Sequence, residues 1–269
     1  MKVQNLILIS VQLLFKPFIN RLKLGEGGLV AFNLISALFS QKDALKIGIE
    51  TLFSFWVMCV LYGFNDYKDV EKDSLNPKKE KGFIKVIVEN KNLFFWLING
   101  MYFLTISFSL FVFNRSTAFV LVALYIVNLT YSKFAKAIPI LDIVAVVLWG
   151  GLFTMLVNLD HFLLNLSAGV MTGIAHVYQM IVDKDVDAST RTNTSVVAIK
   201  HSDRIGIAIL CVLLGYCIYS IGSIWVSLFS VLPILIFFTP ASDSKRWQMS
   251  RVFFGLCWIY LLYSVYYEK

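Results

Sequence analysis

Long apolar runs separated by short charged segments constrain this chain more than any other feature. Hydrophobic residues make up 58% of its 269 residues and charged residues only 15%, whereas soluble domains contain about 25% charged residues. A run of about 20 apolar residues can cross the hydrocarbon core of a bilayer. Candidate spans lie at about 24–41, 43–63, 93–113, 117–131, 138–159, 162–182, 203–221, 223–239 and 249–267. The sequence therefore predicts an all-α integral membrane protein with about nine transmembrane helices, forming one domain over 1–269.

The first residues differ from the candidate spans. Residues 5–15, NLILISVQLLF, are too few to cross a bilayer and lack the small-residue cleavage site of a signal peptide. Lys16 and Pro17 end this apolar run. We therefore expect residues 1–22 to be an N-terminal interfacial segment, with a helix that lies on the membrane surface.

The basic residues indicate how the spans are oriented. If the N-terminus is cytoplasmic, twenty of the 24 Lys and Arg residues fall on the cytoplasmic side of the membrane. The other four are Lys42, Lys46, Arg115 and Lys269. Such a bias is the positive-inside pattern of multi-pass proteins. It predicts that the loops after the second, fourth and sixth spans are cytoplasmic, and it explains the net charge of +7 without a nucleic-acid partner.

Cysteine and histidine residues show no metal-binding pattern. The four cysteines lie inside apolar runs without a CxxC motif, so we expect them to be small buried hydrophobic side chains. The three histidines, His161, His176 and His201, are scattered along the chain, and their spacing identifies none of them as a metal ligand.

The most polar stretch, FNDYKDVEKDSLNPKKEKG at 64–82, begins where the second span ends. Asp66, Asp69 and Asp73 fall at positions i, i+3 and i+7, and Asn65 precedes Asp69 by four residues. If the span continues as a helix, these side chains line one face. Carboxylates stacked in this way repel one another and require a cation, and their hard oxygen atoms suit Mg²⁺. For this array alone, a solvated helix end is the alternative interpretation.

A second acidic array ends the sixth span, in the stretch QMIVDKDVDASTRTNT. Asp183 and Asp187 are spaced i and i+4, with Asp185 between them. The span count places both arrays on the same side of the membrane, at the C-terminal ends of their spans. Two facing carboxylate clusters would hold metal ions that bridge a diphosphate, and nearby Lys or Arg side chains would offset the remaining phosphate charge.

The NDxxDxxxD array, the DxxxD array and the number of spans together resemble the UbiA family of membrane-embedded prenyltransferases. The resemblance covers nearly the whole chain in layout. It implies helices arranged around a central cavity with cytoplasmic cap loops, embedded in a lipid bilayer. It also implies Mg²⁺ as cofactor and transfer of a prenyl group from a prenyl diphosphate to a hydrophobic or amphipathic acceptor, either aromatic or lipid.

The resemblance also assigns roles to individual residues. The stretch YSKFAKAIPILD is similar to a Tyr-Ser…Lys loop of the family near the diphosphate, although an interfacial anchor is an alternative, and Lys16-Pro17 stands where the family often has Arg-Pro. The implied catalytic residues are Asp66, Asp69, Asp183, Asp187 and Tyr131. The implied substrate ligands are Asn65, Lys16, Lys133, Lys136, Lys184 and Arg191. The implied metal ligands are Asn65, Asp66, Asp69, Asp73, Asp183 and Asp187.

Other functions stay open at this point. Residues 38–83, together with the stretch YSKFAKAIPILD, also resemble the family branch that transfers phosphoribose from phosphoribosyl diphosphate to a polyprenyl phosphate. That branch usually has Arg-Pro-Ile-Ala where this chain has Gly82-Phe83-Ile84-Lys85, and the complete second array is more typical of prenyl transfer. A terpene cyclase would use the same scaffold without an external acceptor. A transporter would place its acidic residues at the membrane midplane in broken helices, whereas here they lie at span ends. At the position of Arg191 the family commonly has glycine.

Overall fold

The computed structural model describes residues 3–23, 27–75, 80–190, 192–222 and 227–267, and all regular elements within these ranges are helices. In chain order they are α1 (Val3–Lys23), α2 (Gly28–Phe39), α3 (Ala44–Leu75), α4 (Lys81–Glu89), α5 (Lys91–Val112), α6 (Arg115–Lys133), η1 (Ala135–Ala137), α7 (Leu141–Met155), α8 (Phe162–Ser189), α9 (Ser195–Ala198), α10 (Ser202–Ile221), η2 (Leu228–Val231), α12 (Leu232–Phe237) and α13 (Asp243–Tyr267). The prediction of an all-α fold is confirmed.

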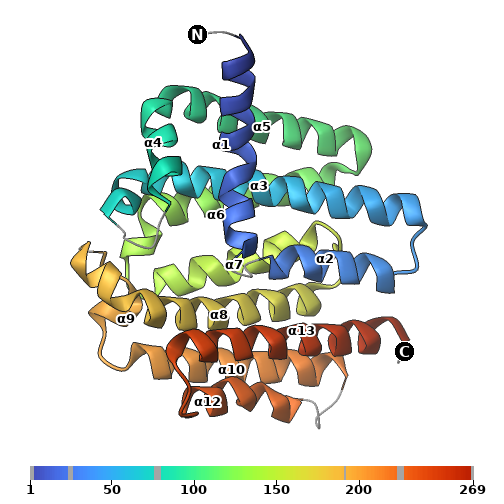
Figure 1. Ribbon diagram of the computed structural model, residues 1–269. Coiled ribbons are helices and arrows are strands. Elements are labelled where there is room, and N and C mark those ends of the chain that lie inside the picture. Colours follow the sequence, from blue (N-terminus) through green and yellow to red (C-terminus); the bar gives the residue numbers. More distant parts are fainter. Residues whose placement is uncertain (1–2, 24–26, 76–79, 191, 223–226, 268–269) are drawn as a thin grey trace.

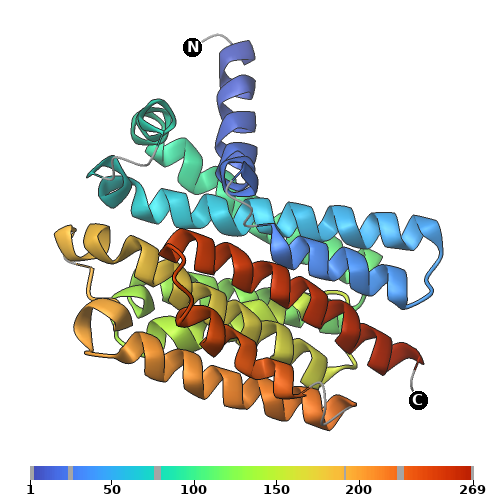
Figure 2. The same ribbon diagram turned by 60° about the horizontal axis from the view of Figure 1, so that its bottom comes forward.

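Most of the long helices run along one common direction, and α1 crosses them (Figures 1 and 2). Two helices organise the packing. Helix α3 contacts α1, α2, α5 and α6, and helix α8 contacts α7, α10 and α13. Both α3 and α8 end on the same side of the bundle, near the short helices α4 and α9 (Figure 1).

Five helices in the described part of the chain are long and apolar enough to cross a membrane. They are Ala44–Glu71, Lys91–Val112, Arg115–Lys133, Ser202–Ile221 and Asp243–Tyr267. A bent pair, formed by α1 and α2, would make a sixth span. Each of the nine expected spans overlaps a helix, but α2 and α7 have only 12 and 15 residues. The expected count of nine spans is therefore not confirmed.

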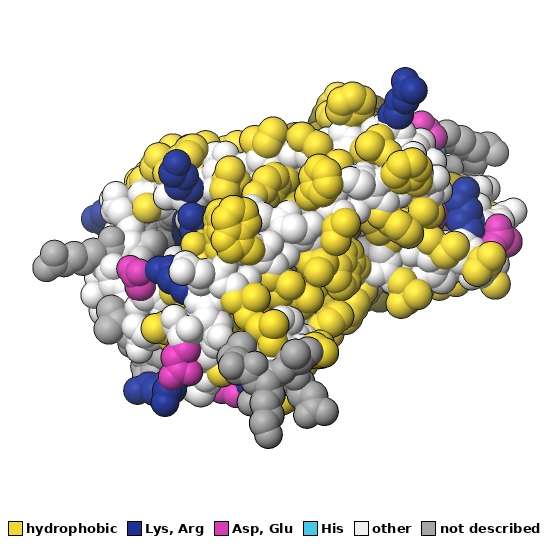
Figure 3. All heavy atoms as spheres, turned by 90° about the horizontal axis from the view of Figure 1, so that it is seen from above, with side chains coloured by type: hydrophobic (Ala, Val, Ile, Leu, Met, Phe, Trp, Pro, Cys, Tyr) yellow, Lys and Arg dark blue, Asp and Glu magenta, His cyan; other side chains and the backbone are white. Residues whose placement is uncertain are grey.

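Apolar side chains cover much of the molecular surface. Hydrophobic atoms spread over the middle of the face in Figure 3, and charged side chains gather towards its two ends. Phe111, Phe119 and Val212 are 89%, 74% and 74% exposed. Exposed apolar area on this scale marks a surface that contacts lipid, and we treat the chain as a multi-pass membrane protein. The four cysteines are free and buried, as predicted.

Helix α1 extends beyond the apolar run that ends at Lys16-Pro17. It continues through Pro17 to Lys23. Pro17 lacks an N–H for the preceding turn, but the side chain of Arg21 donates to the Pro17 carbonyl at 3.0 Å in the following turn. Helices α1 and α2 are bent by 88° from each other. The interfacial location of residues 1–22 stays a prediction, and a helix that crosses the bundle direction is compatible with it.

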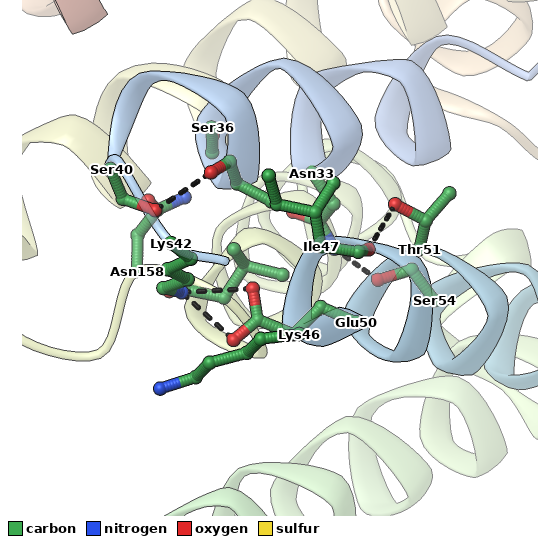
Figure 4. A network of polar contacts seen from close by, with 12 residues as sticks. Asn33, Ser36, Ser40, Lys42, Lys46, Ile47, Glu50, Thr51, Ser54 and Asn158 are labelled. Carbon is green, nitrogen blue, oxygen red and sulfur yellow. Dashed lines mark hydrogen bonds and ion pairs between the residues drawn. The ribbon is translucent and has the colours of Figure 1, made fainter. Parts of the chain in front are cut away.

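Buried polar contacts tie the helices together at the end of the bundle where α2 joins α3 (Figure 4). Lys42 Nζ lies 2.8 Å from each carboxylate oxygen of Glu50, which is only 5% exposed. The same ammonium lies 3.4 Å from the carbonyl of Val157, in the connection between α7 and α8. Asn33 of α2 donates to Ser54 of α3 at 2.9 Å. These contacts fix α2, α3 and the α7–α8 connection at the end opposite to the acidic arrays.

Candidate functional site

Both acidic arrays are helical and line the same cavity. Helix α3 extends to Leu75 and helix α8 to Ser189, so each array occupies the last turns of a long helix, as predicted. A cavity of about 1280 Å³ lies between these helix ends, with further walls from α1, α2, α4, α7 and α13. The six predicted metal ligands, Asn65, Asp66, Asp69, Asp73, Asp183 and Asp187, all line it.

Most of the remaining wall is apolar. Phe32, Tyr62, Trp149, Met171 and Phe254 line the cavity, and they come from α2, α3, α7, α8 and α13 respectively. The cavity thus combines a carboxylate-rich part with an apolar part formed by helices that are far apart in the sequence. A ligand that consists of a charged head group and an apolar tail would match these two parts of the cavity.

In the first array, Asp66 is paired with a residue from the N-terminal helix. The residue Asp66 is only 7% exposed, and its carboxylate lies 2.5 Å from Nη2 of Arg21. The Arg21 guanidinium also lies 4.3 Å from the ring centroid of Tyr62, a cation–π contact. Burying a carboxylate is costly unless a cation and hydrogen bonds compensate for lost water. Arg21 therefore supplies the cation that compensates for burying the Asp66 side chain in the cavity. Asn65, next to it, accepts a hydrogen bond from the Ser132 hydroxyl.

Asp69 is paired with the loop that follows α6. Lys136 Nζ lies 2.5 Å from the Asp69 carboxylate, and both side chains line the cavity. Burial alone would lower the pKa of Lys136, but the charge of Asp69, then that of Tyr131 and the hydrogen bond to Asp69, outweigh it and raise this pKa above its usual value. Lys136 therefore stays a cation at the acidic end of the cavity.

The second array is fixed through the loop that follows it. Asp187 is 7% exposed and Asp183 is half-buried. Beyond them, the backbone N–H of Ser195 donates to Asp142 at 2.7 Å, and the Ser195 hydroxyl donates to the same carboxylate at 2.5 Å. The Ser195 hydroxyl also accepts from the backbone N–H of Ile140 at 2.6 Å. Because Asp142 and Ser195 are fully buried, these bonds lock the loop after α8 onto the start of α7.

Lys16 acts at the edge of the site rather than on its wall. Its ammonium lies 2.6 Å from Glu80 and 5.2 Å from the ring centroid of Phe83. This hydrogen bond, opposed by a smaller effect of burial, lowers the pKa of Glu80. Phe83 and Ile84 of α4 are buried and line the cavity. Lys16 therefore ties α1 to the helix that covers the acidic end of the cavity.

The remaining predicted ligands lie outside the cavity or outside the described residues. Lys133 and Lys184 are exposed and do not line the cavity wall. Arg191 lies outside the residues that the structure describes. Tyr131, by contrast, was predicted as a catalytic residue, and it does line the cavity. The roles of Lys133, Lys184 and Arg191 in substrate binding stay predictions.

The donor set fits Mg²⁺ shared with a ligand. Among the described residues, no three His, Cys, Asp or Glu side chains group closely enough to hold a metal ion by themselves. Mg²⁺ usually binds through one or two carboxylates and completes its shell with water and substrate phosphates. Carboxylates from two helix ends that line one cavity suit that arrangement, and they do not suit an all-protein metal cage.

Among the cavity residues that were not identified from the sequence, Arg21 and His176 matter most for the site. Arg21 counted only as one of the basic residues of the N-terminal segment, because no local spacing links it to Asp66. His176 was set aside because the histidines are scattered. Its spacing carried a signal, since it precedes Asp183 by seven residues and therefore shares a helix face with it.

Comparisons with known proteins identify the fold. The sequence matches no protein-family model and no curated protein. A solved structure of a UbiA homolog from Archaeoglobus fulgidus bound to GPP and Mg²⁺ matches with a TM-score of 0.65 and 15% identity, covering 90% of this chain and 97% of that chain. A second structure of a UbiA homolog from the same organism, bound to DMAPP and Mg²⁺, matches with a TM-score of 0.63 and 14% identity, covering 90% of this chain and 96% of that one. The chain therefore has the fold of these UbiA homologs over nearly its whole length.

Proposed function

We propose that this chain is a UbiA-family prenyltransferase, which moves a prenyl group from a prenyl diphosphate to an acceptor with the help of Mg²⁺. One observation carries the proposal: acidic arrays from α3 and α8 line a single cavity whose remaining wall is mostly apolar. The two solved structures with the same fold are bound to prenyl diphosphates and Mg²⁺, which supports this choice of donor and metal.

The acidic part of the cavity is the proposed diphosphate site. Asn65, Asp66, Asp69, Asp73, Asp183 and Asp187 are the proposed metal ligands. When bound there, Mg²⁺ would neutralise the negative charge that grows on the leaving diphosphate.

Two cations of the chain itself are placed to bind the same group. Arg21 and Lys136 line the cavity beside the aspartates that they pair with. An Arg guanidinium and a Lys ammonium both donate charge-assisted hydrogen bonds to phosphate oxygens. We therefore assign Arg21, which the sequence did not single out, to diphosphate binding together with Lys136.

The apolar part of the cavity is the proposed place for the prenyl chain. Side chains such as Phe32, Trp149 and Phe254 offer an apolar surface against which the chain can pack. Such a wall also keeps water away from the allylic carbon, so that the carbon reacts with the acceptor instead of being hydrolysed. The acceptor itself is proposed to be a hydrophobic or amphipathic molecule that enters this part of the cavity.

A donor assay tests the proposal directly. The purified protein, incubated with radiolabelled geranylgeranyl diphosphate and Mg²⁺, should bind or consume the labelled compound, and excess chelator should prevent this. Labelled phosphoribosyl diphosphate should be ignored, even when a polyprenyl phosphate is supplied. Passage of label from phosphoribosyl diphosphate into the polyprenyl phosphate would instead identify a phosphoribosyltransferase. A labelled cyclic hydrocarbon formed without any acceptor would identify a cyclase.

A further inference from the structure

His176 lines the cavity but has no part in the proposed binding of metal or diphosphate. It lies on α8, seven residues before Asp183 and eleven before Asp187. At 1.5 Å per residue, these separations correspond to about 10 and 16 Å along the helix axis. Because all three side chains line one cavity, His176 lies deeper in it than the acidic array, beside the apolar wall.

A second polar side chain meets His176 from another helix. The hydroxyl of Tyr131, at the end of α6, lies 3.5 Å from Nε2 of the imidazole. The two rings are in edge-to-face contact, with centroids 6.0 Å apart and planes inclined by 73°. Both residues line the cavity. The imidazole is therefore held between α6 and α8, with a cavity-facing position that a substrate can reach.

The proposed reaction needs a side chain that accepts a proton inside the cavity. Transfer to a hydroxyl-bearing acceptor breaks the bond between the allylic carbon and the diphosphate oxygen, and its electron pair leaves with the diphosphate. A new bond joins that carbon to the acceptor oxygen, which must then lose its proton. A neutral imidazole has one unprotonated ring nitrogen that accepts such a proton. Asp66 and Asp69 are held instead by Arg21 and Lys136.

We propose that His176 is the catalytic base that takes the proton from the acceptor, and that Tyr131 positions its ring. This inference rests on the proposed function and narrows the acceptor to molecules with a reacting hydroxyl, either an alcohol or a phenol. The balance is complete, because the prenyl group replaces the hydroxyl proton, the proton goes to His176, and the diphosphate leaves with the electron pair of the broken bond.

The test separates donor binding from transfer. His176→Gln and His176→Ala are compared with the unaltered protein, with geranylgeranyl diphosphate as donor and two acceptors, glycerol 1-phosphate as an alcohol and 1-naphthol as a phenol. Mg²⁺-dependent donor binding should stay within about twofold in both variants, because the diphosphate site is untouched. Transfer should fall on the order of a hundredfold or more, as expected when a positioned base is lost. Added imidazole should restore part of the transfer by His176→Ala and none by His176→Gln, in which the glutamine fills the space.

His161→Gln is the matched control, since His161 precedes the other end of α8 and does not line the cavity. It should transfer at the unaltered rate. Undiminished transfer by His176→Gln would overturn the proposal, and so would equal loss of donor binding and transfer in both His176 variants. Transfer to neither hydroxyl probe by an unaltered protein that binds the donor would overturn the acceptor class. If the unaltered protein does not bind the prenyl diphosphate at all, the proposed function itself is wrong, and the proposed role of His176, which rests on it, is wrong as well.

Discussion

At the scale of single residues, the acidic arrays are defined by what they pair with. Asp66 and Asp69 each contact a cation at 2.5 Å, and those cations come from α1 and from the loop after α6. The pairs offset the charge of the two carboxylates. They also place two cations beside the acidic arrays, where the proposed diphosphate would bring negative charge.

Neutralising one carboxylate in each array tests whether the arrays act as one unit. We expect Asp66→Asn and Asp183→Asn each to reduce turnover of a prenyl diphosphate on the order of a hundredfold or more, because each removes charge that would hold the metal. The double variant should be little worse than either single one, since groups that act together are far from additive. Steady-state rates at saturating Mg²⁺ measure this.

Asp185→Asn serves as the matched control for that prediction. Asp185 lies between Asp183 and Asp187 in the sequence, but it is exposed and does not line the cavity. Its variant should keep nearly full activity. Multiplicative losses in the double variant Asp66→Asn/Asp183→Asn would show that the two arrays act independently, which contradicts a shared site.

The acidic residues of the site were predictable from the sequence, whereas their partners were not. Helical spacing places Asp66, Asp69 and Asp73 on one face from local information alone. Arg21 is 45 residues away from Asp66 in the sequence, and a contact over that separation depends on how α1 crosses α3. His176 has a helical relation to Asp183, but its contact with Tyr131 depends on how α6 and α8 are both placed against α7.

At the scale of elements, the two ends of α3 have different roles. Its last turns carry the first acidic array, and its second turn carries Glu50, which pairs with Lys42. Glu50 and Asp66 are sixteen residues apart, or about 24 Å along the helix. The Lys42–Glu50 pair also reaches the carbonyl of Val157, so it anchors the α2–α3 and α7–α8 connections to each other.

Breaking this buried pair should destabilise the protein without a direct effect on the site. Glu50→Gln leaves the Lys42 ammonium without its carboxylate, and Lys42→Met leaves a carboxylate that is 5% exposed without its cation. Each change should lower the free energy of unfolding by about 3 kcal/mol, while the double variant Lys42→Met/Glu50→Leu should lie much closer to the unaltered protein. Denaturant unfolding in detergent measures these differences.

The exposed pair between Lys85 and Glu89 is the control for this cycle. Its side chains are 76% and 59% exposed and the charged atoms lie 3.7 Å apart, so Lys85→Met should leave stability unchanged within error. Equal destabilisation by the Lys42–Glu50 single and double variants would mean that the pair contributes through packing and not through paired charge.

The sequence predicted which elements exist better than where they end. The hydropathy pattern identified a helix for every expected span, because apolar runs of this length have few other solutions in a bilayer. It could not predict that α1 passes through Pro17 or that α2 has only 12 residues. Helix ends depend on tertiary contacts, such as those of Arg21 and Lys42, that hydropathy does not encode.

At the scale of the whole molecule, the end of the bundle that is predicted to be cytoplasmic is also the end that carries the acidic arrays. The C-terminal ends of α3 and α8, with the cavity between them, lie at one end, and the Lys42–Glu50 pair lies at the other (Figures 1 and 4). The positive-inside bias predicts that the end with the acidic arrays is cytoplasmic. The donor would then reach the cavity from the cytoplasmic side, and the acceptor from the bilayer or the cytoplasm.

Cysteine labelling tests this orientation. Ser74, at the end of α3, and Ser189, at the end of α8, are both exposed, and the four native cysteines are buried. In intact cells, a membrane-impermeant maleimide should leave Ser74→Cys and Ser189→Cys unlabelled and should label Lys46→Cys, which is exposed at the opposite end. In inverted vesicles the pattern should reverse, because the cytoplasmic face is then outside. Labelling of Ser74→Cys and Ser189→Cys from opposite sides would show that the two arrays lie on different sides of the membrane, which contradicts a shared site. Labelling of both from outside intact cells would leave the shared site possible but would show that the orientation is opposite to the predicted one.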